Sequence, residues 1–202
     1  MNRFIKTLVI IGIIFVILFV GFASLGFYRM YQKNKTEEAI SRINNTIINL
    51  DDVMGKNLPP KPDQLLNDST VAGFDVNNNK IRDDVEITIF EKYPNSAKIR
   101  TGMLQYAQAL QLQITEVFNS KTLVKTIQKE GYGSLCISEA ILNEDLKTAL
   151  TTSNNRQKEI EDIIFNTVIR KEKHSENLKK YMTTYSSKAG VRCDINLLSL
   201  PN

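Results

Sequence analysis

Hydrophobic and polar positions divide the chain into one continuous apolar run and a longer part with helical spacing. The run, Leu8 to Tyr28, contains 21 residues and no charged side chain. A helix needs roughly 20 apolar residues to cross a bilayer. A core helix of a soluble protein would also show a polar stripe, and this run has none. The pattern therefore predicts one membrane-spanning helix.

After the run, apolar residues recur every three or four positions. A helical stalk over residues 36–54 is predicted from four of them, Ile40, Ile43, Ile47 and Leu50. The stretch GKNLPPKPDQ follows, and its three prolines force an extended chain, so residues 55–66 are interpreted as a linker. Residues 67–202 are interpreted as the folded domain.

Within residues 67–202 the same spacing predicts helices and no strand. The expected helices span residues 83–93, 97–118, 123–131, 134–150 and 156–186. Gly131 is expected to cap the third of these, Asn154 or Asn155 to begin the last, and Gly190 to end it. The expected fold class is all-α, a single transmembrane helix followed by a small helical bundle with one calcium-type loop.

Charge is concentrated beside the apolar run. Residues 1–35 carry five basic side chains and no acid, whereas the rest of the chain holds 21 basic and 22 acidic side chains. The net charge of +4 therefore belongs to the flanks of the run. A nucleic-acid-binding domain would carry a basic face of its own. We expect the membrane and a protein of the envelope as partners, and no nucleic acid.

The N-terminal segment also indicates a location. A short basic tail before an apolar core is typical of a secretory signal, but this run is longer than the roughly 7 to 15 residues of a cleaved signal core. Residues 1–35 are therefore interpreted as an uncleaved signal anchor, with cleavage near Gly21 to Gly26 as the alternative. Nineteen asparagines with many lysines and isoleucines fit an AT-rich bacterial genome. We expect a bacterial inner-membrane protein whose C-terminal domain lies in the periplasm.

Two cysteines, Cys136 and Cys193, are the only ones in the chain. An even number suits one disulfide in an oxidising compartment, and the alternative is two free thiols in a reducing cytosol. The secretory segment favours the disulfide. Closing a loop of this length stabilises a domain by roughly 3 to 4 kcal/mol.

The segment GFDVNNNKIRDDVE, residues 73–86, is rich in oxygen donors. A twelve-residue calcium loop binds through its first, third, fifth, seventh, ninth and twelfth positions, the seventh by a backbone carbonyl and the twelfth by a bidentate glutamate. Counted from the first acid of the segment, those positions are Asp75, Asn77, Asn79, Ile81, Asp83 and Glu86.

This segment resembles the calcium loops of EF-hand-like families, in particular the shortened loops of dockerins and thrombospondin type 3 repeats. It is also similar to a DxNxNGIRDDVE loop of uncharacterised bacterial envelope proteins. The resemblance covers about twelve residues and implies one Ca²⁺ cofactor. It makes Asp75, Asn77, Asn79, Asp83 and Glu86 side-chain ligands, with Ile81 a backbone ligand.

Two features weaken the match. The sixth position, normally glycine, is Lys80, which costs of the order of 1 kcal/mol if the backbone there is left-handed and adds a positive charge. No clear helix enters the loop. We therefore expect weak binding, with a dissociation constant of roughly 10⁻⁴ to 10⁻³ M. The alternative without metal is a capping box, in which Asp83 accepts from free amides and Glu86 folds back at the start of a helix.

No complete catalytic motif occurs, and the one histidine, His174, lies among lysines in a predicted helix. Paired carboxylates occur on helices with alternating charge, as on solvated faces, at Glu37/Glu38, Asp51/Asp52 and Glu159/Glu161. We expect a non-catalytic binding or structural module. Two alternatives stay open: a small subunit of a membrane complex without metal, and an envelope hydrolase that uses carboxylates.

Overall fold

The computed structural model describes residues 3–141, 145–186 and 193–201. It divides into two compact units, Met1–Ala39 and Ile40–Asn202. The first unit belongs to one long helix, α1 (Arg3–Asn45), whose apolar side chains between Leu8 and Tyr28 are mostly exposed. Of the helices described, α1 alone is long and apolar enough to span a membrane, a property that a signal sequence shares.

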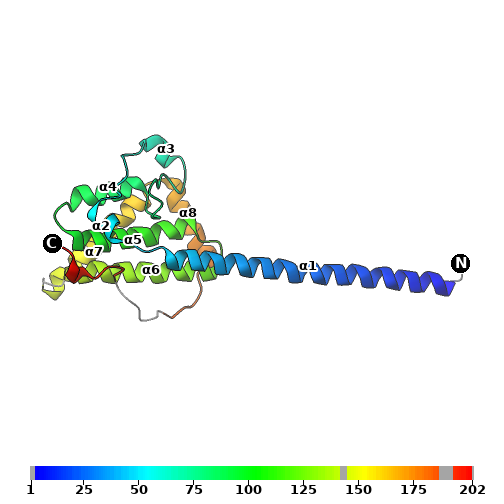
Figure 1. Ribbon diagram of the computed structural model, residues 1–202. Coiled ribbons are helices and arrows are strands. Elements are labelled where there is room, and N and C mark those ends of the chain that lie inside the picture. The colour runs from blue at the N-terminus through cyan, green and yellow to red at the C-terminus, as the bar shows by residue number, and fades with distance from the viewer. Residues whose placement is uncertain (1–2, 142–144, 187–192, 202) are drawn as a thin grey trace. The chain divides into compact units, whose positions relative to one another are not determined.

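The second unit is built from helices joined by loops (Figure 1). Among the described residues there is no strand, so the expected all-α class is confirmed. The elements after α1 are α2 (Leu50–Met54), α3 (Gln64–Asp68), α4 (Asp83–Lys92), α5 (Ala97–Thr115), α6 (Ser120–Glu139), α7 (Leu146–Ile164), α8 (Val168–Tyr181) and a short 3-10 helix, η1 (Leu197–Ser199).

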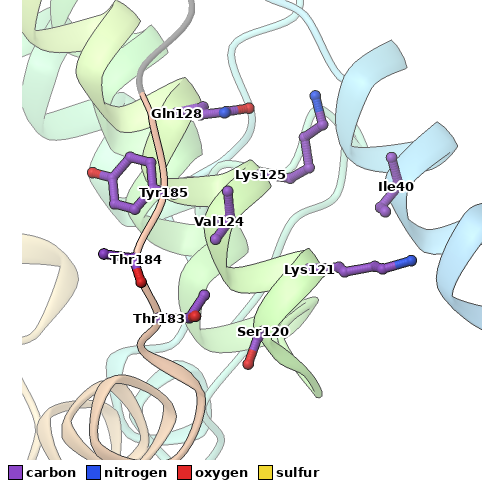
Figure 2. Close-up of a pocket in the computed structure, with 9 residues that line it drawn as sticks. All are labelled: Ile40, Ser120, Lys121, Val124, Lys125, Gln128, Thr183, Thr184 and Tyr185. Carbon is purple, nitrogen blue, oxygen red and sulfur yellow. The ribbon is translucent and has the colours of Figure 1, made fainter.

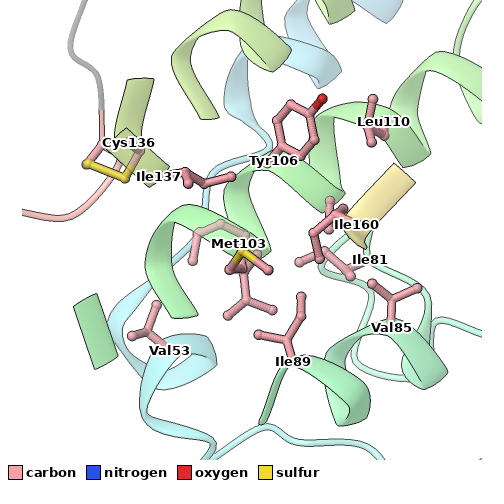
Figure 3. Packing of buried hydrophobic residues seen from close by; sticks show 14 of the residues in the cluster. Val53, Ile81, Val85, Ile89, Met103, Tyr106, Leu110, Cys136, Ile137 and Ile160 are labelled. Carbon is pink, nitrogen blue, oxygen red and sulfur yellow. A yellow bond between two sulfur atoms is a disulfide. The ribbon is translucent and has the colours of Figure 1, made fainter. Parts of the chain in front are cut away.

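Helix α5 lies at the centre of this unit and contacts α2, α4, α6, α7 and α8. Its apolar residues meet those of the surrounding elements in one core, in which Met103 lies near Val53, Ile89 and Ile160 (Figure 3). Helix α5 also buries several glutamines that hold loops in place. Gln111 donates to the carbonyl of Ala72 over 2.8 Å, and Asp194 donates its backbone N–H to Gln105 over 2.9 Å.

The Cys136–Cys193 disulfide expected from the cysteine count is present. It ties α6 to the segment after residue 192, as Figure 3 shows. That segment packs Leu197 and Leu200 into the core. The disulfide therefore fastens two elements that are 57 residues apart in sequence.

Gly131 does not end a helix, contrary to the prediction, because α6 continues through it to Glu139. The close contact between α5 and α6 explains why. A Cβ atom on Gly133 would lie 2.7 Å from the backbone of Tyr106, and one on Gly102 would lie 2.8 Å from the backbone of Ile137. Packing at this distance outweighs the cost of roughly 1 kcal/mol for each glycine inside a helix.

The prediction of one long helix over residues 156–186 is also wrong. The chain forms two helices there, α7 and α8, separated at residues 165–167. Helix α7 begins ten residues earlier than predicted, because Asp145 caps it by accepting from the amides of Lys147 and Thr148. Asn154 and Asn155 therefore lie inside α7. The predicted end at Gly190 lies outside the described residues.

Three other boundaries differ from the prediction. The stalk helix is interrupted, because α1 ends at Asn45 and Asn49 caps a separate α2 by accepting from the Asp52 amide. The predicted helix over residues 134–150 is divided between the end of α6 and the start of α7, and the helix predicted over residues 97–118 ends at Thr115. Helix α3 was not predicted, and its first three residues lie inside the stretch 55–66 that was interpreted as an extended linker.

We predict opposite effects of alanine at two glycines of α6. Gly133→Ala inserts a methyl group against the α5 backbone and should lower the free energy of unfolding by about 1 to 3 kcal/mol. Gly131→Ala, whose Cβ meets nothing within 4 Å, should raise it by up to about 1 kcal/mol. Urea unfolding of the full chain in a non-ionic detergent measures both. Equal effects at the two positions would contradict the close α5–α6 contact.

Candidate metal centre

The acidic loop begins at a left-handed glycine, Gly73, and ends where α4 starts. Its two ends are joined by the Asp83 amide, which donates to the Phe74 carbonyl over 2.8 Å. From α5, Gln108 donates to the Asn79 carbonyl over 2.8 Å. The loop is therefore closed on itself and held against the central helix.

Three side chains at alternate positions bend the loop inward. Asp75 accepts from the amides of Asn79 and Lys80, both over 3.1 Å. Asn77 accepts from the Asn79 amide over 3.3 Å, and Asn79 accepts from the Ile81 amide over 2.9 Å. The backbone is left-handed at Lys80, with φ of 67°. This is the sixth position, where the calcium-loop pattern places glycine.

Glu86 reaches the same loop from the first turn of α4. Its carboxylate is buried and accepts from the side-chain amides of Asn77, over 3.1 Å, and Asn79, over 2.7 Å. Hydrogen bonds within the loop thus connect four of the six residues predicted as ligands: Asp75, Asn77, Asn79 and Glu86. Ile81, predicted to bind through its carbonyl, buries its side chain in the core.

Asp83, the remaining predicted ligand, has one oxygen that is not satisfied by the protein. Its Oδ1 accepts from the Val76 amide over 3.0 Å. Its Oδ2 is buried and receives no hydrogen bond from any described residue. Buried carboxylate oxygens are rarely left in this state without a ligand, ion or water.

The capping-box alternative is wrong, because neither of the two hydrogen bonds that define a capping box is present at the start of α4. The N-cap of α4 is Arg82, and no side chain caps that helix. The Asp83 side chain bonds the Val76 amide, which lies in the loop, and Glu86 bonds Asn77 and Asn79 rather than the N-cap amide. Asp83 and Glu86 therefore bond the loop and not the free amides of the helix, while Asp84 pairs with Arg82.

The surroundings of the loop disfavour the ionised form of its carboxyl groups. Burial raises the pKa of Glu86 to about 8, and the nearby charges of Asp52 and Asp83 act in the same direction. Burial also raises the pKa of Asp75 and of Asp83. Carboxyl groups in this condition gain most from a cation, which favours their ionised form.

The donor set fits calcium in kind. The loop carries three carboxylates and two side-chain amides, and calcium takes oxygen ligands of these types. Two features oppose a tight site. Lys80 adds a positive charge, and the side-chain nitrogens of Asn77 and Asn79 face Glu86, so both amides must turn to offer their oxygens.

Sequence reasoning missed three residues that support the loop. Gln108 comes from α5, as described, and the Asn57 carbonyl accepts from the Asn77 side chain over 3.0 Å. Asp52, noted in the sequence only as half of an acidic pair, influences Glu86 through its charge. These residues lie 20 or more positions from their partners in the loop, so no local pattern connects them.

The remaining polar groups considered in the sequence have other partners. His174 stacks on Phe165 with ring centroids 4.3 Å apart and bonds Gln113 over 2.9 Å, and burial lowers its pKa. Glu159 and Glu161 each accept from a tyrosine hydroxyl. No cluster of three His, Cys, Asp or Glu side chains suited to a metal occurs in the described part of the chain. Asparagines complete the loop instead.

A cavity of about 310 Å³ lies elsewhere, between α6 and residues 183–185 (Figure 2). It is lined by Ile40, Val124 and Tyr185 together with Lys121 and Lys125. Among the described residues that line it, the charged side chains are basic, so it does not suit a cation.

Comparison with known proteins found no matching family model, curated sequence or solved structure. The loop geometry is therefore the observation from which a function can be proposed.

Without metal, the domain should lose stability as the pH rises from about 4.5 to about 8. Glu86 keeps its proton to a higher pH in the folded chain than in the unfolded chain, so folding binds a proton across this interval. Thermal unfolding of the full chain in metal-free buffer measures the effect. His174 opposes it only below its ordinary pKa of 6.5. Glu86→Gln should flatten the profile between pH 6.5 and 8, and an unchanged slope in that variant would contradict the assignment.

Proposed function

We propose that this chain is a single-pass, membrane-anchored protein of a bacterial envelope. Its helical domain lies outside the cytoplasm and acts as a non-catalytic binding or structural module that one calcium ion stabilises. The anchor is the apolar part of α1, and the domain is the helical unit around α5. In this proposal the domain lies in the periplasm, where the calcium concentration is higher than in the cytosol and a weak site can be occupied.

The unsatisfied Oδ2 of Asp83 is the observation that supports calcium most directly. It lies in a loop whose side chains at alternate positions bend inward and whose sixth residue, Lys80, is left-handed. A simple polar turn needs neither a buried carboxylate without a partner nor a buried glutamate from the following helix. Both features have a reason if a divalent cation completes the loop.

The disulfide supports a location outside the cytoplasm. Cys136 and Cys193 are joined in the structure, and such bonds persist in oxidising compartments. An N-terminal helix of membrane-spanning length is consistent with export of the domain. The inner membrane of a bacterium, with the domain in the periplasm, satisfies both conditions.

Calcium should raise the thermal stability of the full chain in detergent. For a dissociation constant of roughly 10⁻⁴ to 10⁻³ M, 10 mM calcium adds about 1.5 to 3 kcal/mol. The midpoint of thermal unfolding should then rise by about 3 to 12 °C. Sodium chloride of equal ionic strength should leave the midpoint in place.

Glu86→Gln removes the charge of the predicted bidentate ligand while keeping its shape. This variant should lose the calcium effect, yet at pH 8 without metal it should be at least as stable as the natural chain. Glu91→Gln, an exposed site on the same helix, is the matched control and should keep the full effect. A natural chain whose midpoint stays constant in 10 mM calcium would refute the calcium function.

The location has a separate test. In intact bacteria expressing the full chain, acid quenching followed by alkylation without a reducing agent should leave Cys136 and Cys193 unlabelled, because they are already bonded. Prior reduction should make both reactive. A chain labelled at both cysteines without reduction would show a reducing compartment and contradict the periplasmic assignment.

A further inference from the structure

A segment outside the acidic loop, residues 45–57, lies along the open side of that loop. The two border a cavity of about 280 Å³. Residues 77–80 of the loop line one side, and residues of the segment, among them Asn49, Asp52 and Asn57, line the other. The segment follows directly after α1 in the sequence and contains α2.

A chain of hydrogen bonds links this segment to the acids of the loop. The Asn77 side-chain nitrogen donates both to the Glu86 carboxylate, over 3.1 Å, and to the Asn57 carbonyl, over 3.0 Å. The Asn57 side chain in turn donates to Oδ1 of Asp52 over 3.4 Å. Through Asn77 and Asn57, the carboxylates of Asp52 and Glu86 belong to one polar network. A cation that turns the Asn77 amide replaces the two bonds of this nitrogen and leaves Asp52 beside the loop.

Asp52 is held in this network by neutral donors. Its side chain is buried, with 4% of the residue exposed, and its hydrogen-bond donors, the Asn49 amide and the Asn57 side chain, are neutral. The basic residue close to it in sequence, Lys56, pairs with its neighbour Asp51 over 2.7 Å. A buried charge with neutral partners gains strongly from a nearby cation.

The loop needs this additional charge. The loop holds three carboxylates, those of Asp75, Asp83 and Glu86, and the positive charge of Lys80 acts on Asp75. Calcium affinity increases with the number of negative charges around the ion. Asp52 acts on Glu86 through its charge, and it comes from a segment that the calcium-loop pattern does not include.

We propose that the calcium site is shared between the loop and the membrane-proximal segment 45–57. Asp52 supplies negative charge to a cation held by the loop, and the bound cation fastens the segment to the loop. This inference rests on the calcium function proposed above. Calcium binding would then determine how tightly segment 45–57 is held against the loop.

The test compares Asp52→Asn with the natural full chain in detergent, titrated with calcium chloride in a calorimeter. The substituted amide keeps the oxygen that caps α2 but lacks the charge, so the dissociation constant should rise about tenfold, as for other groups just outside a metal's ligands. Asp51→Asn is the matched control. It alters the neighbouring acid, which is half-exposed and paired with Lys56, and should change the constant by less than about twofold.

Amide hydrogen exchange on the natural chain tests the second half of the proposal without any substitution. Calcium should slow exchange over residues 45–57 as much as over the loop, and leave α8 unchanged. Protection confined to the loop, or equal calcium affinity in Asp52→Asn and the natural chain, overturns the shared site and leaves the calcium function standing. A natural chain that shows neither heat nor protection overturns both.

Discussion

The buried guanidinium group of Arg82 joins the acidic loop to the helical bundle. It donates to the carbonyls of Ile163 and Ile164, the last residues of α7, whose carbonyls no helical amide can reach. From the other side, Arg170 of α8 pairs with Asp68 and donates to three carbonyls in the segment before the loop. Burying two such charges is costly unless each is fully hydrogen-bonded. The position of the loop and the separation of α7 from α8 therefore depend on the same contacts.

Apolar spacing predicted the elements whose ends are decided locally. Helix α4 stops before Pro94, and α5 carries an uninterrupted apolar stripe, so both were found near their observed positions. Two of the errors occur where distant contacts decide. The glycine at position 131 looked like a helix end because nothing in the sequence shows that α5 packs closely against the same stretch of α6. The break after Ile164 could not be seen in the sequence because the arginine that bonds the free carbonyls there lies 82 residues away.

The inward turn of the loop was predictable from its sequence, whereas the residues that surround the loop were not. Asp75, Asn77 and Asn79 stand at alternate positions of one short segment, and the structure turns all three inward. The left-handed backbone at Lys80 follows from the same register, although lysine itself gives no sign of it. A non-glycine residue keeps this strained conformation only where its surroundings fix it, and here Gln108 and Asp75 hold the turn from both sides.

The segment that carries Cys193 has a consequence for how the protein is made. Leu197 and Leu200 complete the core around α5, and the Asp194 carboxylate accepts from the Ile48 amide, more than 140 residues earlier. A ribosome delivers this segment after every helix of the bundle, so the core lacks part of its packing while the helices emerge. An exported chain would then cross the membrane before its native packing is complete. The Cys136–Cys193 bond would form only after the last segment has packed against the helices outside the cytoplasm.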